Sequence, residues 1–120
     1  MIEQNKQKNL RNTHLVRNKQ LVIRYYETDI ITITPKVIAI DLSFRTASMT
    51  RRINSILGCL QWGHVYYDRG KYTYVCSGAK VILNESPWTL KIFGIHDIEE
   101  LYLSLRQAFK FSSVKEEEEE

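Results

Sequence analysis

The chain has 120 residues, of which 43% are hydrophobic and 26% charged, and its formal net charge at pH 7 is +3. This composition is that of an ordinary globular domain and excludes a collagen-like, disulfide-rich or wholly disordered chain. No window approaches 18 apolar residues and the amino-terminal residues lack an apolar signal-peptide core. We therefore expect a soluble, cytoplasmic protein with no membrane partner.

Charge is distributed unevenly along the chain. Residues 1–80 hold 13 Lys and Arg against 5 Asp and Glu, whereas residues 81–120 hold 4 against 9. Residues 1–19 are polar and carry five basic side chains (Lys6, Lys8, Arg11, Arg17 and Lys19), which predicts a largely flexible basic arm. Residues 113–120 end in five glutamates and predict an acidic disordered tail, which either only solubilises the chain or screens its basic face. One folded domain is expected over residues 20–112.

The segment from residue 20 to residue 42 is rich in β-branched and aromatic residues. Its pattern predicts a strand, a kink near Glu27 to Asp29, a further strand, a tight turn at Pro35-Lys36 and a last strand. Residues 28–34 are expected to pair with residues 37–42 as a hairpin.

An amphipathic helix is predicted next. Its apolar stripe, at helical spacing, consists of Met49, Ile53, Ile56, Leu57 and Leu60. Thr46 or Ser48 is expected to cap its start, and Gly58 marks its end.

The helical spacing places Arg51, Arg52 and Asn54 on the outer side of this helix, with Arg45 in the loop before it. A helix start carries free backbone N–H groups that attract negative charge. Together with three arginines, these groups predict a site that binds phosphate or another anion.

The second half of the chain predicts more hairpins and a closing helix. Residues 64–76 alternate and turn at Arg69-Gly70, and residues 79–93 repeat this pattern around a turn at 84–87. Residues 97–111 predict a helix whose apolar face is Ile98, Leu101, Tyr102, Leu105, Ala108 and Phe109. The expected fold is α+β, in the order β-β-α-β-β-β-β-α, with a mostly antiparallel sheet and both helices packed on one face.

Residues with catalytic or metal-binding chemistry are few and scattered. Cys59 and Cys76 lie seventeen positions apart without a CxxC motif, so we expect reduced, mostly buried thiols, with a disulfide as the alternative. The three histidines have no metal-binding spacing, and Asp29, Asp41 and Asp68 are typical of turns and surfaces. The sequence predicts a non-enzymatic protein with no catalytic residue, metal or cofactor.

Two kinds of binding function remain open. The first is binding of nucleic acid or another anionic partner through a basic face, for which the candidate residues are Arg45, Thr46, Arg51, Arg52, Asn54, Arg69 and Lys71. Tyr66 and Tyr72 would stack bases or, like Trp88, contact a partner. The second is a protein-interaction module that uses exposed strand edges. Arginines gathered with aromatic rings favour nucleic acid, whereas dispersed arginines and a bare apolar edge favour a protein partner.

Several short segments between residues 26 and 90 are similar to those of a group of small, mostly uncharacterised bacteriophage and prophage proteins. The matching pieces are Thr28-Asp29-Ile30-Ile31, Phe44-Arg45-Thr46, Met49-Thr50-Arg51-Arg52-Ile53-Asn54, Tyr74-Val75, Leu83-Asn84-Glu85 and Thr89-Leu90. The most distinctive piece is Arg-Thr followed by Arg-Ile-Asn, although this chain has Leu42, Ser43 and Phe44 where the group has glycines and Trp. The resemblance implies a viral or mobile-element protein that acts in a host cell, with a host or phage protein complex as one kind of partner.

Overall fold

The computed structural model describes residues 7–43, 46–83 and 89–116. In chain order the elements are β1 (Lys8–Arg17), β2 (Leu21–Tyr25), β3 (Thr28–Ile33), β4 (Val37–Asp41), α1 (Ala47–Cys59), β5 (His64–Asp68), β6 (Lys71–Cys76), β7 (Ala79–Leu83), β8 (Thr89–Phe93), α2 (Ile98–Ala108) and β9 (Phe109–Glu116). The strands form a six-stranded sheet in the order β8-β4-β3-β2-β1-β9 and a three-stranded sheet in the order β5-β6-β7. The prediction of a mostly antiparallel α+β fold is confirmed.

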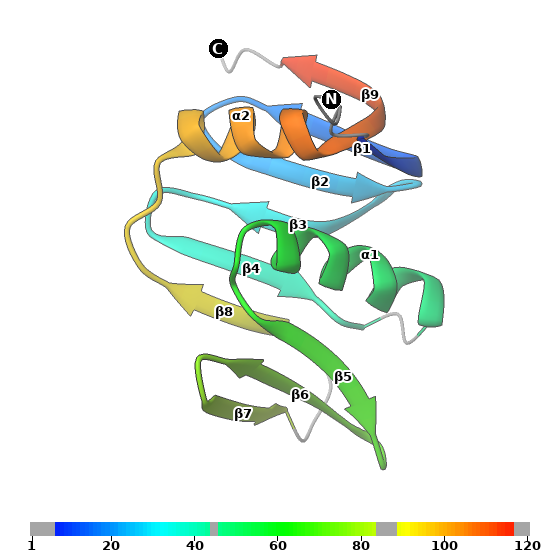
Figure 1. The fold of residues 1–120 in the computed structure, drawn as a ribbon, viewed down its shortest axis with the longest axis vertical. Helices are drawn as coiled ribbons and strands as arrows, with labels where there is room; N and C mark the ends of the chain where they lie inside the picture. Colours follow the sequence, from blue (N-terminus) through cyan, green and yellow to red (C-terminus); the bar gives the residue numbers. More distant parts are fainter. Residues whose placement is uncertain (1–6, 44–45, 84–88, 117–120) are drawn as a thin grey trace, which may run out of the picture.

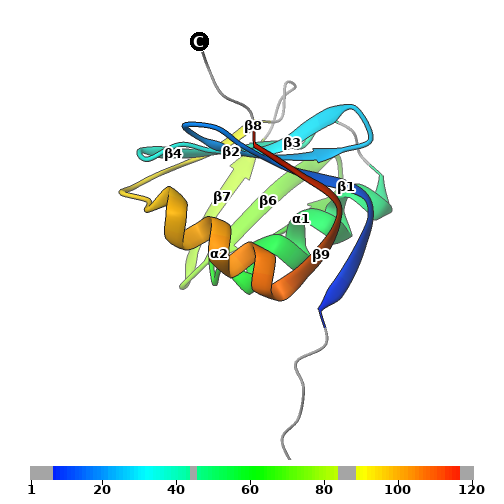
Figure 2. The same ribbon diagram turned by 90° about the horizontal axis from the view of Figure 1, so that it is seen from above.

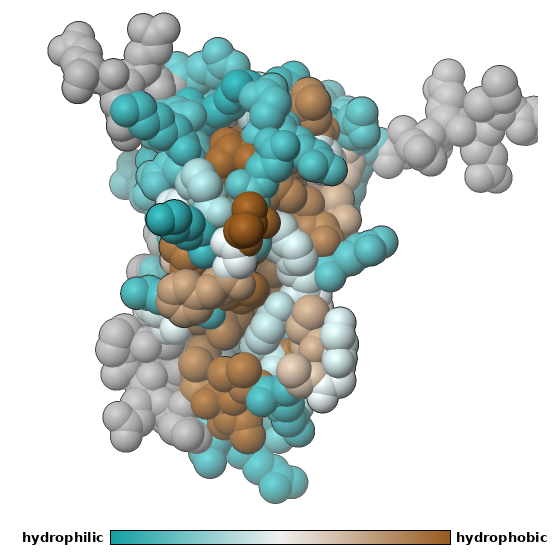
Figure 3. All heavy atoms as spheres, turned by 90° about the vertical axis from the view of Figure 1, so that its left-hand side faces the viewer, coloured by the Kyte–Doolittle hydropathy of each residue, from teal (hydrophilic) through white to brown (hydrophobic). Residues whose placement is uncertain are grey.

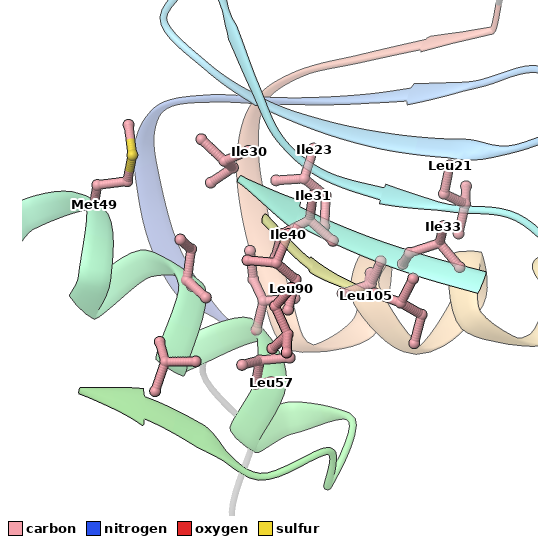
Figure 4. Packing of buried hydrophobic residues seen from close by; sticks show 14 of the residues in the cluster. Leu21, Ile23, Ile30, Ile31, Ile33, Ile40, Met49, Leu57, Leu90 and Leu105 are labelled. Carbon is pink, nitrogen blue, oxygen red and sulfur yellow. The ribbon is translucent and has the colours of Figure 1, made fainter. Parts of the chain in front are cut away.

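Both helices cover the same face of the six-stranded sheet, as predicted (Figures 1 and 2). Alternate side chains of the strands point toward these helices and form the core with the apolar stripes of α1 and α2 (Figure 4). Ile23, Ile31 and Ile40 of the sheet and Leu57 and Leu105 of the helices have at most 1% of their surface exposed. Burying a side chain of this size contributes about 2 kcal/mol, so this layer is the main stabilising contact of the fold.

Both helices begin at a side-chain cap, and Thr46 is one of the two residues expected to cap the first. The Thr46 hydroxyl accepts a hydrogen bond from the Met49 N–H at 3.2 Å, and an Asp97 carboxylate oxygen accepts one from the Glu100 N–H at 3.2 Å. Most of the predicted apolar stripe of α1 is buried, namely Met49, Ile53, Ile56 and Leu57, and Leu60 packs partly against the core.

The prediction of a flexible arm over residues 1–19 is wrong for residues 8–17, which form β1 between β2 and β9. Leu10, Leu15 and Val16 are buried although most of the other residues of this strand are polar. The composition of residues 1–19 suggested a loose segment. A strand that is paired on both sides needs few apolar side chains of its own, because the neighbouring strands satisfy its backbone groups.

The second helix is also shorter than predicted. It ends at Ala108, and residues 109–116 form β9, which pairs in parallel with β1. Phe109 and Phe111 are therefore buried on alternate positions of a strand and not on a helical face. Residues 113–116 of the predicted tail belong to this strand, whereas residues 117–120 lie outside the described residues.

The hairpin predictions are confirmed in two cases and changed in two others. β3 pairs with β4 and β5 pairs with β6 as predicted, with the latter turn at Arg69-Gly70. The predicted kink near residue 27 is a full turn, because Tyr25 pairs with Thr28 and β2 runs antiparallel to β3. β7 and β8 form as strands but pair with β6 and β4 instead of with each other, and the turn predicted at 84–87 lies outside the described residues.

The side chain of Asn54 joins α1 to β5. Its Nδ2 donates to the Val65 carbonyl at 2.8 Å, and its Oδ1 accepts from the Val65 N–H at 2.8 Å. Asn54→Ala leaves both backbone groups of a buried residue without this partner and is expected to lower the free energy of unfolding by about 2 kcal/mol in urea titrations. Thr50→Ala, on the same helix, should change it by less than about 0.5 kcal/mol. Equal losses in the two variants would contradict this role of Asn54.

Candidate anion-binding site

A surface cavity of about 360 Å³ lies between the start of β1 and the first half of α1. Its lining residues are Lys8, Asn9, Leu10, Ser48, Arg51, Arg52 and Ser55. Three of them are cationic, none is acidic, and the two serines and Asn9 add neutral hydrogen-bonding groups. The cavity therefore attracts anions and offers donors to hold them.

The helical period explains why these residues gather. Ser48, Arg51, Arg52 and Ser55 are spaced at i, i+3, i+4 and i+7, so they share one face of α1. That face turns toward β1, whose Lys8 ammonium donates to the Ser55 hydroxyl at 2.6 Å. The sequence placed the arginines on an outer helix face, but it gave no sign that a strand from the amino-terminal segment would form the opposite wall.

Arg52 is held on all sides by other residues of the protein. Its Nε donates to the Thr13 hydroxyl at 2.9 Å, one Nη to the Ser48 hydroxyl at 2.8 Å, and the other Nη to the Arg11 carbonyl at 2.9 Å. The guanidinium also lies 4.0 Å from the centre of the Tyr25 ring. Arg52 thus fastens α1 to β1 and β2. Because most of its N–H groups are used in these contacts, it contributes positive charge to the cavity but few free hydrogen-bond donors.

Arg51 and Lys8 are the cations available to a ligand. The Arg51 side chain is exposed and makes no hydrogen bond or ion pair with another described residue. Lys8 donates one hydrogen bond, to Ser55, and an ammonium group carries three N–H donors. Both side chains can therefore bind an anion without first breaking an ion pair.

Tyr25, the last residue of β2, borders the cavity, and Tyr26 in the turn that follows packs against Tyr25. The Tyr25 hydroxyl is 3.2 Å from the Ser48 hydroxyl, and the centre of the Tyr26 ring is 4.7 Å from that of Tyr25. Tyr26 is 59% exposed. Neither tyrosine was predicted as a site residue from the sequence, because their position near Arg52 depends on the pairing of β1 with β2.

Four other predicted anion-binding residues are described by the structure, and none of them lines the cavity. Thr46 caps α1, and Asn54 is used by the backbone of β5. Arg69 and Lys71 are exposed at the β5–β6 turn, where Arg69 lies 4.0 Å from the Asp68 carboxylate. Arg45 lies outside the described residues.

The predicted stacking residues are less accessible than expected. Tyr72 is 1% exposed, so the prediction that it stacks a base is wrong; its position on β6 buries it in the core. Tyr66 is half-buried, with its ring 6.1 Å from that of His64. Tyr74 is also buried, and its hydroxyl donates to the Trp62 carbonyl while burial raises its pKa. Trp88 lies outside the described residues.

Other candidate sites are weaker. Cys59 and Cys76 are free thiols, as predicted, although Cys59 is exposed and Cys76 half-buried; desolvation raises the pKa of the Cys59 thiol and so lowers its reactivity. Within residues 7–43, 46–83 and 89–116, no three His, Cys, Asp or Glu side chains lie close enough to share a metal ion. No helix in the same ranges is long and apolar enough to cross a membrane.

No protein-family model, no curated protein and no solved structure matches the chain at a significant level. The resemblance to small phage proteins thus stays a prediction from a few short segments. The assignment of function rests on the geometry of the chain itself.

The contacts of the two neighbouring arginines predict that their removal changes stability by very different amounts. Arg52→Ala removes four hydrogen bonds and a cation–π contact, and it is expected to lower the free energy of unfolding by about 3 kcal/mol. Arg51→Ala removes the same charge one residue away and should change stability by less than about 0.5 kcal/mol. Urea titrations followed by tryptophan fluorescence measure both. Similar losses for the two variants would refute the fastening role of Arg52.

Proposed function

We propose that the protein is a small, non-enzymatic binding protein that holds nucleic acid by its phosphates. The observation that carries this proposal is the cavity with three cations and no acidic residue in its lining. Lys and Arg contacts to phosphate supply most of the affinity of proteins for nucleic acid without sequence preference. Arg51 offers a planar set of donors, and the Lys8 ammonium adds further N–H donors to a site for one phosphate group.

The surroundings of the cavity favour a phosphate chain over a single small anion. Arg11 is exposed and lies in the bulge of β1, so its charge extends the basic surface beyond the cavity. Elsewhere, several cations are already paired with carboxylates, such as Arg17 with Glu99 and Glu116, and Arg24 with Asp29. At the start of β1, by contrast, neither Lys8 nor Arg51 is paired with a carboxylate of the described part of the chain.

Charge removal in the cavity tests this function. The double variant Lys8→Ala with Arg51→Ala is expected to bind a fluorescent oligonucleotide at least about ten-fold more weakly at low salt, and its log–log salt slope should fall by about 2. The matched control removes two exposed lysines outside the cavity, Lys71→Ala with Lys80→Ala. Fluorescence anisotropy at several salt concentrations measures both. Equal weakening in the two double variants would argue against a defined site.

A second candidate function, a protein-interaction module, is favoured by one apolar surface. Phe93 is 77% and Ile95 100% exposed, which is unusual for large apolar side chains in an ordered segment. Their backbone is fixed, because the Gly94 N–H donates to the Lys36 carbonyl at 3.0 Å and the His96 N–H to the Pro35 carbonyl at 2.8 Å. Figure 3 shows hydrophobic surface on this side of the molecule at the β8–α2 connection and again over the three-stranded sheet. A protein with an apolar pocket is the partner that such rigid anchors fit.

This second function makes its own prediction. Phe93→Ser with Ile95→Ser should abolish retention of a host or phage protein that the wild-type chain holds through repeated washes. Leu103→Ser, which changes a 53% exposed residue on α2, should leave retention intact. Quantitative mass spectrometry of the retained proteins compares the three chains. Retention that is equal in all of them would exclude this surface as the contact.

A further inference from the structure

Tyr26 occupies a backbone position that favours glycine. It is the first residue of the two-residue turn between Tyr25 and Thr28, and its φ is +54°. Positive φ at this position of a hairpin turn is adopted most easily by Gly, and a bulky side chain there costs about 1–2 kcal/mol. Such strain persists only where the surrounding structure holds it, and it is concentrated at functional sites.

The bulge in β1 holds Tyr26 in place. The Tyr26 N–H donates to the Asn12 carbonyl at 2.8 Å, and the Asn12 side-chain amide donates to the Tyr26 hydroxyl at 3.1 Å. Asn12 itself has φ +56° and belongs to the irregular stretch between Leu10 and His14. The ring is thus fixed at its backbone, at its hydroxyl and against Tyr25, yet 59% of the residue remains exposed. Core packing does not account for a tyrosine at this position.

The Tyr26 ring is connected to the basic cavity through Tyr25. The centre of the Tyr25 ring lies 4.0 Å from the Arg52 guanidinium and 4.7 Å from the centre of the Tyr26 ring, and the two ring planes are tilted by 59°. Ser48 and Arg52 line the cavity, and the Ser48 hydroxyl is 3.2 Å from the Tyr25 hydroxyl, so Tyr25 borders the cavity. Each base of a strand is flanked by phosphates, so a strand that reaches the Tyr26 ring also brings phosphates toward the cavity.

We propose that Tyr26 is the platform on which a base of a single-stranded nucleic acid stacks while a neighbouring phosphate occupies the cavity between Lys8 and Arg51. This inference rests on the function proposed above and specifies its ligand as a single strand. A duplex hides the faces of its bases, whereas a single strand exposes them for stacking on aromatic side chains. The Glu27 carboxylate, next along the turn, repels phosphate and so keeps the backbone of the strand at the cavity.

The variant Tyr26→Gly distinguishes a role of the Tyr26 ring in binding from a role in stability. It removes the ring and relieves the backbone strain, so stability in urea should stay equal or rise, while binding of a labelled oligothymidylate of about 12 nucleotides should weaken about ten-fold. Tyr26→Trp should keep most of the binding, because a larger ring still stacks. Tyr67→Ser, which removes another exposed aromatic residue, should bind as the wild type does. The wild type should bind a duplex of the same length more weakly than the single strand, and Tyr26→Gly should leave the affinity for the duplex unchanged.

The outcomes distinguish this inference from the proposed function. If Tyr26→Gly binds the single strand as well as the wild type while Lys8→Ala with Arg51→Ala weakens it, the platform is refuted and phosphate binding stands. Equal affinity of the wild type for single strand and duplex, or full competition by inorganic polyphosphate at equal phosphate concentration, likewise refutes stacking. If the wild type binds neither oligonucleotide at low salt, both the inference and the proposed function fail.

Discussion

The parallel pairing of β1 with β9 is the constraint on which the rest of the structure depends. It joins Lys8–Arg17 to Phe109–Glu116, near opposite ends of the chain, and so places β1 in the interior of the six-stranded sheet. Because β1 also pairs with β2, the two ladders must be satisfied together, and the register on the β9 side shifts between Leu10 and His14. A bulge of this kind releases backbone groups from the ladder and bends the strand.

The bulge in β1 provides the backbone groups that hold the candidate site together. The Arg11 carbonyl accepts from Arg52, and the Asn12 carbonyl accepts from Tyr26. One irregular stretch therefore fixes both α1 and the β2–β3 turn, and it does so with groups that a regular strand would use for pairing. The position of the basic cavity and the position of the exposed ring have the same structural origin, which is why a combined site for phosphate and base is physically coherent.

Local patterns were enough to predict most of the elements, but not the contacts that make the site. The helical stripe from Met49 to Leu57, the cap at Thr46 and the turn at Arg69-Gly70 depend on neighbours in sequence, and all three are as predicted. The strand nature of residues 8–17 and 109–116 depends on their pairing with each other across the chain, which no local periodicity reports. Arg52 was predicted to be exposed because the partner that covers it, β1, was not foreseen.

The two ends of β1 differ in charge. At the Arg17 end, Glu99 and Glu116 pair with the arginine. The Lys8 end lies nine residues away, about 30 Å along an extended strand and less where the bulge bends it, and the lining of its cavity has no carboxylate. Dissolved salt at about 0.1 M screens charges that are more than about 10 Å apart, so Glu99 and Glu116 do not cancel the field at the cavity. The Lys8 end of β1 is therefore the end at which the proposed contact with a polyanion is electrostatically favoured.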